Sequence, residues 1–209
     1  MRVRKPAETR KAEIIDASLR LADKLGPDRL TTEAIAKAVG LTQPGIFRHF
    51  PKKQDLLEAV AARVRAMMET RWTKAQSGDG AAVDRIHALI GAQLSLIQST
   101  PAIPAILFSQ ELHTKNKSLR KVFFGLMTHF HRVIADLVTQ ACKAGELRDD
   151  LDPEDAAYLI IGLVQGLAVR WSISGRNFDL TEEGNRLLEL QLCGFACGRT
   201  TADGERRAS

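Results

Sequence analysis

The stretch TTEAIAKAVGLTQPGIFRHFPKK, residues 31–53, decides the fold of the N-terminal part of this chain. Thr31 offers a hydroxyl that can cap a short helix, and Gly40 offers the positive φ that ends it. Thr42 is a second cap, and Pro44 falls in the following first turn, where its missing N–H costs no intrahelical bond. The stretch therefore predicts two short helices joined by a tight turn.

The apolar residues of this stretch predict how the two helices meet. Ala36 allows close approach, Gly40 turns the chain and Ile46 packs between the helices, which is helix-turn-helix spacing. At roughly 100° per residue, Ile46 and Phe50 face inward, which turns Arg48 outward. The outward face is the one that DNA would meet.

Several polar side chains on or near this face are suited to DNA. We expect Gln43 and Arg48 to donate to base edges, Pro44 to touch a thymine methyl, and His49 and Lys53 to bind phosphate. The alternative is a purely structural role. Thr31 and Thr42 would then serve only as helix caps, and Phe47 and His49 would only pack at the base of the helix. The expected DNA-binding residues are Thr31, Thr32, Thr42, Gln43, Pro44, Phe47, Arg48, His49 and Lys53.

Residues 9–60 closely resemble the N-terminal domain of TetR-family transcriptional regulators, in the Thr-capped second helix, the IFRHF core at 46–50 and the lysine that opens the fourth helix. The resemblance covers about the first quarter of the chain. It implies three helices that bind DNA and a fourth that leads into a helical regulatory domain. One departure is Phe47, where the family commonly has a tyrosine whose hydroxyl reaches the DNA backbone. Only packing or stacking is therefore assigned to Phe47.

The basic charge is concentrated at one end of the chain. Residues 1–65 hold 14 Lys and Arg against 8 Asp and Glu, whereas residues 66–209 hold 16 against 17. A phosphate-binding module joined to a neutral module shows this asymmetry, as does a solvated basic face. Arg2, Arg4 and Lys5 precede Thr9, the expected cap of the first helix, and form an arm that either follows a DNA groove or is a disordered tail.

Size and composition indicate a soluble, cytoplasmic protein. The 209 residues, 44% of them hydrophobic, can bury a sizeable core, and we expect a DNA-binding domain at 1–51, a helical domain at 52–198 and a flexible tail at 199–209. No apolar run reaches a membrane span, and the N-terminus is not a secretory signal. Cys142, Cys193 and Cys197 are interpreted as packing residues, with redox sensing as the alternative.

Helical periodicity continues after residue 51, so the fold class is all-α: an N-terminal three-helix helix-turn-helix domain followed by a helical regulatory and dimerisation domain. The patterns predict helices at Lys52–Lys74, Ala81–Gln98, within Pro101–His113, and at Ser118–Ala144, Pro153–Ser174 and Thr181–Cys197.

The helix from Pro153 is apolar around nearly its whole circumference and needs a second surface to cover it. In the resembled family the last two long helices build a two-fold dimer interface, and a monomer that buries this helix in its own core is the alternative. Gly162 and Gly166 permit close helix approach. The expected dimer interface is Leu159, Gly162, Leu163, Gly166, a valine assigned to position 170, Leu188, Gln191 and Phe195.

A small-molecule effector is implied by the resemblance, without a predicted ligand chemistry. The central helices carry enough aromatic and polar side chains for a pocket, although most of these could equally be core. His129 and His131 are two residues apart on a helix and make a poor metal pair, so neither a metal nor a cofactor is expected. The candidate pocket residues are Trp72, His87, Phe108, Glu111, Phe124, Met127 and His131.

These observations predict a homodimeric DNA-binding regulator, most simply a repressor that binds a palindromic operator in double-stranded DNA and is released by an unidentified small molecule. The alternative is a DNA-bound protein whose helical domain docks a protein partner. A ligand-sized cavity would favour the first, and a filled core with an exposed apolar patch the second. An enzyme is not expected, because the chain contains none of the sequence motifs of a nucleophile, a metal protease or a nucleotide-binding loop.

Overall fold

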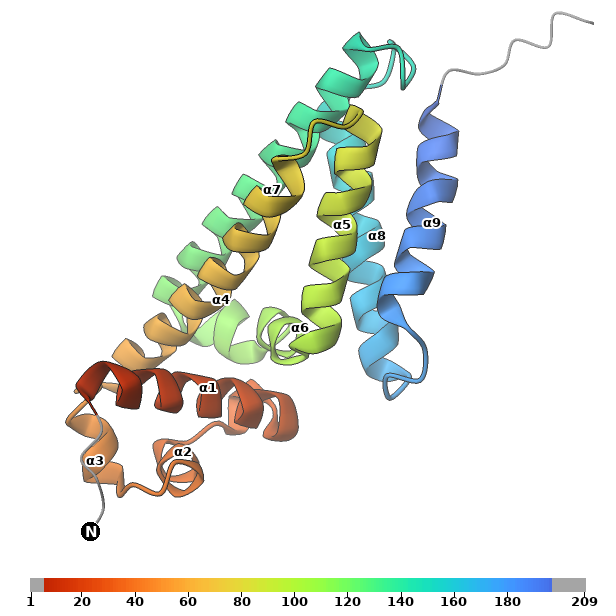
Figure 1. The fold of residues 1–209 in the computed structure, drawn as a ribbon. Coiled ribbons are helices and arrows are strands. Elements are labelled where there is room, and N and C mark those ends of the chain that lie inside the picture. The colour runs from red at the N-terminus through yellow and green to blue at the C-terminus, as the bar shows by residue number, and fades with distance from the viewer. Residues whose placement is uncertain (1–5, 197–209) are drawn as a thin grey trace, which may run out of the picture.

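The structure is a computed structural model that describes residues 6–196. Within this range it consists of helices joined by turns, without a strand, which confirms the all-α fold class. Figure 1 shows a small N-terminal group of helices at one end of a bundle of longer ones. The predicted arm of Arg2, Arg4 and Lys5, together with Cys197 and the predicted tail at 199–209, lies outside the described residues.

The N-terminal group contains α1 (Ala7–Leu25), the 3₁₀ turn η1 (Pro27–Arg29), α2 (Thr32–Ala38) and α3 (Gln43–Phe47). The prediction that Thr9 caps α1 is wrong, because the helix begins two residues earlier and the carbonyl of Pro6 accepts the N–H of Arg10 at 3.0 Å. The Ala-Glu pair that follows Pro6 has high helix propensity and places an acidic residue in the first turn, so the helix forms without a side-chain cap.

The remaining helices form the larger domain, and five of the six predicted ranges agree with them to within two residues at each end. α5 lies in the middle and packs against α4, α7 and α9, while α8 packs between α7 and α9. The elements are α4 (Lys53–Gln76), α5 (Ala82–Ser99), α6 (Ala102–Leu107), the π-helical turn η2 (Glu111–Lys115), α7 (Lys117–Lys143), α8 (Pro153–Ile173) and α9 (Leu180–Phe195).

The sixth range differs: the single short helix predicted within Pro101–His113 is split between α6 and η2. Ser109 explains the break, because its hydroxyl donates to the carbonyl of Ile106 at 2.7 Å and accepts the N–H of Leu112 at 3.2 Å. A buried side chain that satisfies these backbone groups competes with the α-helical bonding pattern.

Side-chain caps determine where the three C-terminal helices begin. The amide oxygen of Asn116 accepts the N–H of Leu119 at 2.9 Å at the start of α7. Asp152 and Asp179 perform the same function for α8 and α9, and Asp179 accepts the N–H of Glu182 at 2.8 Å. Each cap satisfies backbone donors that have no partner inside the helix.

The helix α8 has two kinds of surface. Among the described helices it is the one whose length and mean hydropathy, 1.5 over its most apolar window, would suit a membrane span. Only 44% of that window is buried within the protomer, so an apolar face of α8 stays uncovered in the single chain. A core helix of a soluble bundle passes the same test of composition, and α8 does contribute a face to the core.

Candidate nucleic-acid interface and ligand cavity

The turn between α2 and α3 has the geometry that the sequence predicts. Gly40 adopts φ +64°, and the N–H of Leu41 donates back to the carbonyl of Ala36 at 2.8 Å, which closes the end of α2. Thr31 caps α2 by accepting the N–H of Ala34 at 3.1 Å, and Thr42 caps α3 by accepting the N–H of Gly45 at 3.3 Å.

The face of α3 divides as predicted into a buried side and an open side. Ile46 is fully buried and Phe50 is 6% exposed, so both belong to the core. Pro44 and Arg48 are exposed, Phe47 is 38% exposed and His49 is half-buried. The open side therefore carries a guanidinium and apolar surface together, which suits contact with base edges and sugar-phosphate.

Gln43 and Thr32 form a contact that the sequence did not predict. The amide nitrogen of Gln43 donates to the Thr32 hydroxyl at 2.8 Å, and Thr32 is 8% exposed. This bond ties the first residue of α3 to the first residue of α2. This bond uses one of the two N–H donors of the Gln43 amide nitrogen and leaves the other available for DNA.

Exposed lysines flank the open side of α3. Lys52 and Lys53 follow the helix, and Lys37 projects from the end of α2. The carboxylate of Asp55 accepts the backbone N–H of Lys52 at 2.9 Å, which fixes the first turn of α4 and thereby the position of both lysines. Their positive charges lie on the exposed surface around α3, and such charges attract DNA phosphates.

An apolar cavity that is partly open to solvent lies inside the larger domain, between α4, α5, α6, α7 and α8. Its volume is about 50 Å³, which has room for ordered water but is far below the roughly 300–1,000 Å³ of a ligand pocket. Almost all of the lining is hydrocarbon, aromatic ring or thioether, and the polar exceptions are Gln93 and Gln165.

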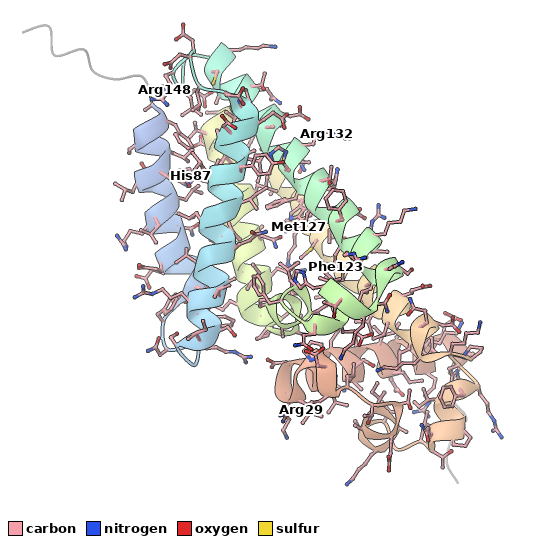
Figure 2. All side chains as sticks on the ribbon, turned by 180° about the vertical axis from the view of Figure 1, so that it is seen from behind. Arg29, His87, Phe123, Met127, Arg132 and Arg148 are labelled. Carbon is pink, nitrogen blue, oxygen red and sulfur yellow. The ribbon has the colours of Figure 1, made fainter. Side chains whose placement is uncertain are left out.

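The seven residues predicted for an effector pocket do not share one cavity. Trp72, Phe108 and Met127 line the apolar cavity, whereas Glu111 lines a small recess between α1, α4 and α7. Phe124 and His131, with Met127, line an open groove of about 260 Å³ between α7 and α8. Figure 2 shows His87 far from Phe123 and Met127, toward the end of the bundle remote from the N-terminal domain.

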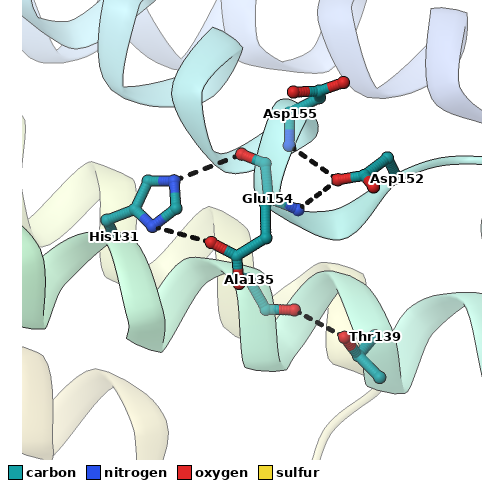
Figure 3. Close-up of polar contacts among 6 residues, drawn as sticks. All are labelled: His131, Ala135, Thr139, Asp152, Glu154 and Asp155. Carbon is teal, nitrogen blue, oxygen red and sulfur yellow. Dashed lines mark hydrogen bonds and ion pairs between the residues drawn. The ribbon is translucent and has the colours of Figure 1, made fainter.

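Both histidines of the predicted pocket, His87 and His131, have structural partners within the protein. His87 pairs with the carboxylate of Glu189 on α9 at 3.0 Å. His131 contacts Glu154 twice, through Nδ1 to the carboxylate at 3.3 Å and through Nε2 to the backbone carbonyl at 3.2 Å (Figure 3). Since Asp152 also bonds the N–H of Glu154, His131 anchors the capped start of α8 onto α7.

The glutamines of the cavity were missed by the sequence analysis. Gln93 lies on the apolar face of α5 in register with Ile86, Ile90 and Ile97, and a polar residue at such a position is the signal that could have revealed it. Gln165 lies on α8 and donates weakly to the sulfur of Met127 at 3.9 Å. Three side chains line both the apolar cavity and the open groove and therefore separate the two: Gln165, Met127 and Ile161.

The predicted dimer interface is partly corrected. Leu159, Gly162 and Gly166 are exposed on α8, and Leu163 and Gln191 are partly exposed. Leu188 and Phe195 are wrong for an interface formed by the protomer as it stands, because they are 0% and 7% exposed and face the protomer's own core. Leu190, which the last helix also offers to this surface, is exposed, and the exposed apolar residues that the prediction overlooked are Tyr158 and Ile173.

The valine predicted at position 170 of this interface is also wrong. Residue 170 is an arginine, Arg170, and the valine of this turn is Val169. Arg170 is exposed, and its charge adds to the hydrogen bond from Arg186 in lowering the pKa of Glu183 on α9. A guanidinium is costly to bury against hydrocarbon, so Arg170 suits the polar rim of an interface. The partly exposed Val169 supplies the apolar surface at this point.

The cysteines in the described range differ in exposure. Cys142 is half-buried and Cys193 is exposed on α9. Desolvation, together with a hydrogen bond to Glu189, raises the pKa of the Cys193 thiol above its ordinary value. A raised pKa leaves less thiolate, the form that reacts with oxidants, and so argues against redox sensing at Cys193.

Comparison with known proteins agrees with this geometry. The family profile "Bacterial regulatory proteins, tetR family" matches residues 14–60, and "YsiA-like protein, C-terminal region" matches residues 61–194. The chain is 23% identical over 183 residues to the fatty acid metabolism regulator protein of Bacillus subtilis, covering 88% of this chain and 94% of that protein. It is 24% identical over 197 residues to the nucleoid occlusion factor SlmA of Aliivibrio fischeri, covering 90% and 97%.

The fold is also that of a solved regulator. The structure of FadR from Bacillus subtilis in complex with stearoyl-CoA superposes with a TM-score of 0.74 at 22% identity, covering 88% of this chain and 98% of that one. Together the two profiles span both the helix-turn-helix domain and the helical domain. The chain therefore belongs to the TetR family of DNA-binding transcriptional regulators.

Proposed function

We propose that this protein is a homodimeric repressor that binds a palindromic operator and is released by an apolar small molecule. The observation that carries the proposal is the pairing of an open, cationic α3 face with an uncovered apolar face on α8. Two chains joined through α8 and α9 would present two copies of α3 to half-sites about 34–36 Å apart, or a multiple of that.

The DNA contacts follow from exposure on and around α3. Arg48 reads a base edge, Pro44 and Phe47 contact thymine methyl or sugar, and Lys53 and His49 bind phosphate. Gln43 reads a base with the N–H that does not bond Thr32, and the capping residues Thr31 and Thr42 contribute hydroxyl contacts to the DNA backbone.

The dimer interface is centred on the exposed face of α8. Leu159, Gly162, Gly166 and Ile173 recur at helical spacing, and no described atom lies within 4 Å of a Cβ built on either glycine. A partner helix can therefore approach closely. Leu190 extends the same apolar surface onto α9. Burying this surface removes exposed hydrocarbon from water, which favours association.

The effector site is the apolar cavity, which a ligand has to enlarge. Met127 and Gln165 are the movable groups between cavity and groove, so an elongated ligand enters through them. The similarity to a fatty acid regulator and to a regulator bound to stearoyl-CoA supports a ligand with a long apolar part. Because Met68 and Trp72 of the cavity wall belong to α4, enlargement moves the helix that follows α3.

The first experiment is selection of bound sequences from random DNA at about 0.15 M salt. A palindromic motif is expected, and stearoyl-CoA added to the labelled operator complex should lower its fluorescence anisotropy. Enrichment of no sequence, with binding that only fades as salt rises, would contradict operator reading. Retention of the operator under every apolar ligand would contradict release.

A second candidate function is docking of a protein partner on the helical domain. The small size of the cavity and the exposed Phe124 and Tyr158 favour it, as does the similarity to a nucleoid occlusion factor. Phe124→Glu on the groove separates the two functions. Loss of regulation in cells with intact dimerisation, operator binding and ligand response would support docking.

The protein would act in the cytoplasm, where its DNA target lies. We propose no catalytic activity and no metal or cofactor.

A further inference from the structure

Among the polar side chains that line the apolar cavity, Gln93 is the strongly buried one. It is 6% exposed, and its amide oxygen accepts the indole N–H of Trp72 at 2.8 Å. Its amide nitrogen has no hydrogen-bond partner among residues 6–196. An amide nitrogen carries two donors, and this one is not among the fully buried side-chain atoms without a partner, so it keeps accessible surface. Because Gln93 lines the cavity, we infer that these donors are available to a ligand there.

The orientation of this amide follows from the chemistry of Trp72. An indole nitrogen can only donate, so the oxygen of Gln93 must face Trp72 and the NH₂ must face away from it. Trp72 itself is held firmly, since it is 2% exposed and stacks on Phe130 with ring centroids 4.5 Å apart. The donor of Gln93 is therefore fixed in direction before any ligand arrives.

No other residue of the wall accepts a hydrogen bond from these donors in the structure. The neighbouring lining side chains, such as Ile97, Leu126 and Phe130, are hydrocarbon. The second glutamine, Gln165, lies on α8 and points toward the sulfur of Met127. A purely hydrocarbon ligand would exclude water and leave the Gln93 NH₂ unpaired, which is unfavourable.

We propose that Gln93 is a specificity-determining residue that selects apolar ligands bearing a carbonyl oxygen. The carbonyl accepts from Gln93 Nε2, and the hydrocarbon part fills the enlarged cavity. This inference rests on the proposed effector site and narrows its ligand class. A site built to hydrogen-bond a ligand group rejects the analogue that lacks this group, because the buried donor is then left unpaired.

The test compares two probes of the same shape, 2-undecanone and its alkene isostere 2-methyl-1-undecene, in which a CH₂ group replaces the carbonyl oxygen. Binding is followed by the fluorescence of Trp72 in a Trp171→Phe background, since these are the two tryptophans of the chain. We expect the ketone to bind about tenfold or more tightly than the alkene.

Three variants locate the source of this preference. Gln93→Leu should remove the ketone preference, and Gln93→Glu should remove it while keeping an acceptor for Trp72. The matched control is Gln110→Leu, which makes the same change at an exposed glutamine outside the cavity wall and should leave the preference intact. Circular dichroism and the unfolding midpoint establish that each variant is folded, and Gln93→Glu stands in if Gln93→Leu is not.

The outcomes separate this inference from the proposed function. Equal binding of the two probes, or a preference that survives both Gln93 variants, would overturn the inference even if each probe releases operator DNA. A Gln93-dependent preference without any effect on DNA binding would support the inference and overturn the effector role. Binding of neither probe would overturn the inference, whereas the proposed function would still be decided by release of the operator with stearoyl-CoA.

Discussion

Arg48 follows the last residue of α3 and is exposed, with its backbone N–H bonded to the carbonyl of Pro44 at 3.2 Å. The backbone of this residue is thus fixed by the helix while its guanidinium is open to solvent. An arginine placed in this way can bind a guanine through two parallel hydrogen bonds. At the scale of single residues, recognition depends on such prearranged donors.

Replacement of Arg48 by alanine tests base reading. We expect Arg48→Ala to weaken operator binding by about 1–3 kcal/mol and to relax the base preference at one position of each half-site. Titrations against operator and scrambled DNA at one salt concentration measure this effect. An equal loss on both DNAs would mean that Arg48 binds phosphate instead.

Asp179 is a residue whose charge state affects stability. Hydrogen bonds from the backbone of Glu182 and from the side chain of Gln98 hold the pKa of the Asp179 carboxyl below its ordinary value of 3.8. A lowered pKa means that the folded state prefers the carboxylate. The resulting stability is present above the ordinary pKa and is lost as pH falls through the lowered one.

We therefore expect Asp179→Asn, which keeps a capping oxygen but cannot ionise, to flatten the acid side of the stability curve. Urea unfolding at about pH 6 and about pH 3 would give a difference between wild type and variant at the higher pH that shrinks at the lower one. A difference that is the same at both pH values would contradict this role.

At the scale of elements, α8 illustrates how one helix serves two interfaces. Ala156, Ile160 and Leu167 face the core, whereas Leu159 and Ile173 are 55% and 81% exposed on the other side. The exposed side has small residues at Gly162 and Gly166, and helices that pack closely need small residues at the crossing point. We therefore propose that a second copy of the chain covers this exposed side.

Replacement of Gly166 by leucine tests this interface. Nothing described lies within 4 Å of the new Cβ, so the protomer should fold normally while the larger side chain separates the two copies. We expect monomers by light scattering and weak operator binding. The matched control is Gly125→Leu on α7, an exposed glycine with equally open surroundings, which should remain dimeric. A dimeric Gly166→Leu protein would exclude this interface.

At the scale of the whole molecule, α4 connects the two sites. It begins just after α3 and carries Met68 and Trp72 into the cavity wall. Near its start, Gln54 and Asn116 exchange amide hydrogen bonds of 3.2 and 2.7 Å, which tie α4 to α7. A ligand that pushes α4 and α7 apart changes the orientation of α3, provided that it binds the two arrangements with different affinity.

Filling the cavity should reduce the effect of a ligand on DNA binding by α3. Ala168 is 3% exposed in the cavity wall on α8, and Ala168→Leu would occupy space that a ligand needs. We expect operator affinity to be unchanged and release by stearoyl-CoA or 2-undecanone to require at least about tenfold more ligand. Ala66→Leu on the exposed side of α4 is the control. An undiminished ligand response of Ala168→Leu would place the effector site elsewhere.

Interactions between residues close in sequence determined much of the secondary structure of this protein. The caps Thr31 and Thr42, the glycine turn at Gly40 and the buried Ile46 follow from interactions within a few residues, so the sequence predicted the helix-turn-helix and most helix boundaries. For the same reason the resemblance in this region was specific enough to indicate the family.

Tertiary structure decided which distant residues meet. The pairing of Gln43 with Thr32 and of Gln93 with Trp72 joins different helices, and helical periodicity carries no information about such contacts. Leu188 and Phe195 were assigned to the wrong surface because a helix that is apolar on several sides does not reveal which side meets its own core. Only the packing of α5, α8 and α9 left Tyr158, Ile173 and Leu190 outside.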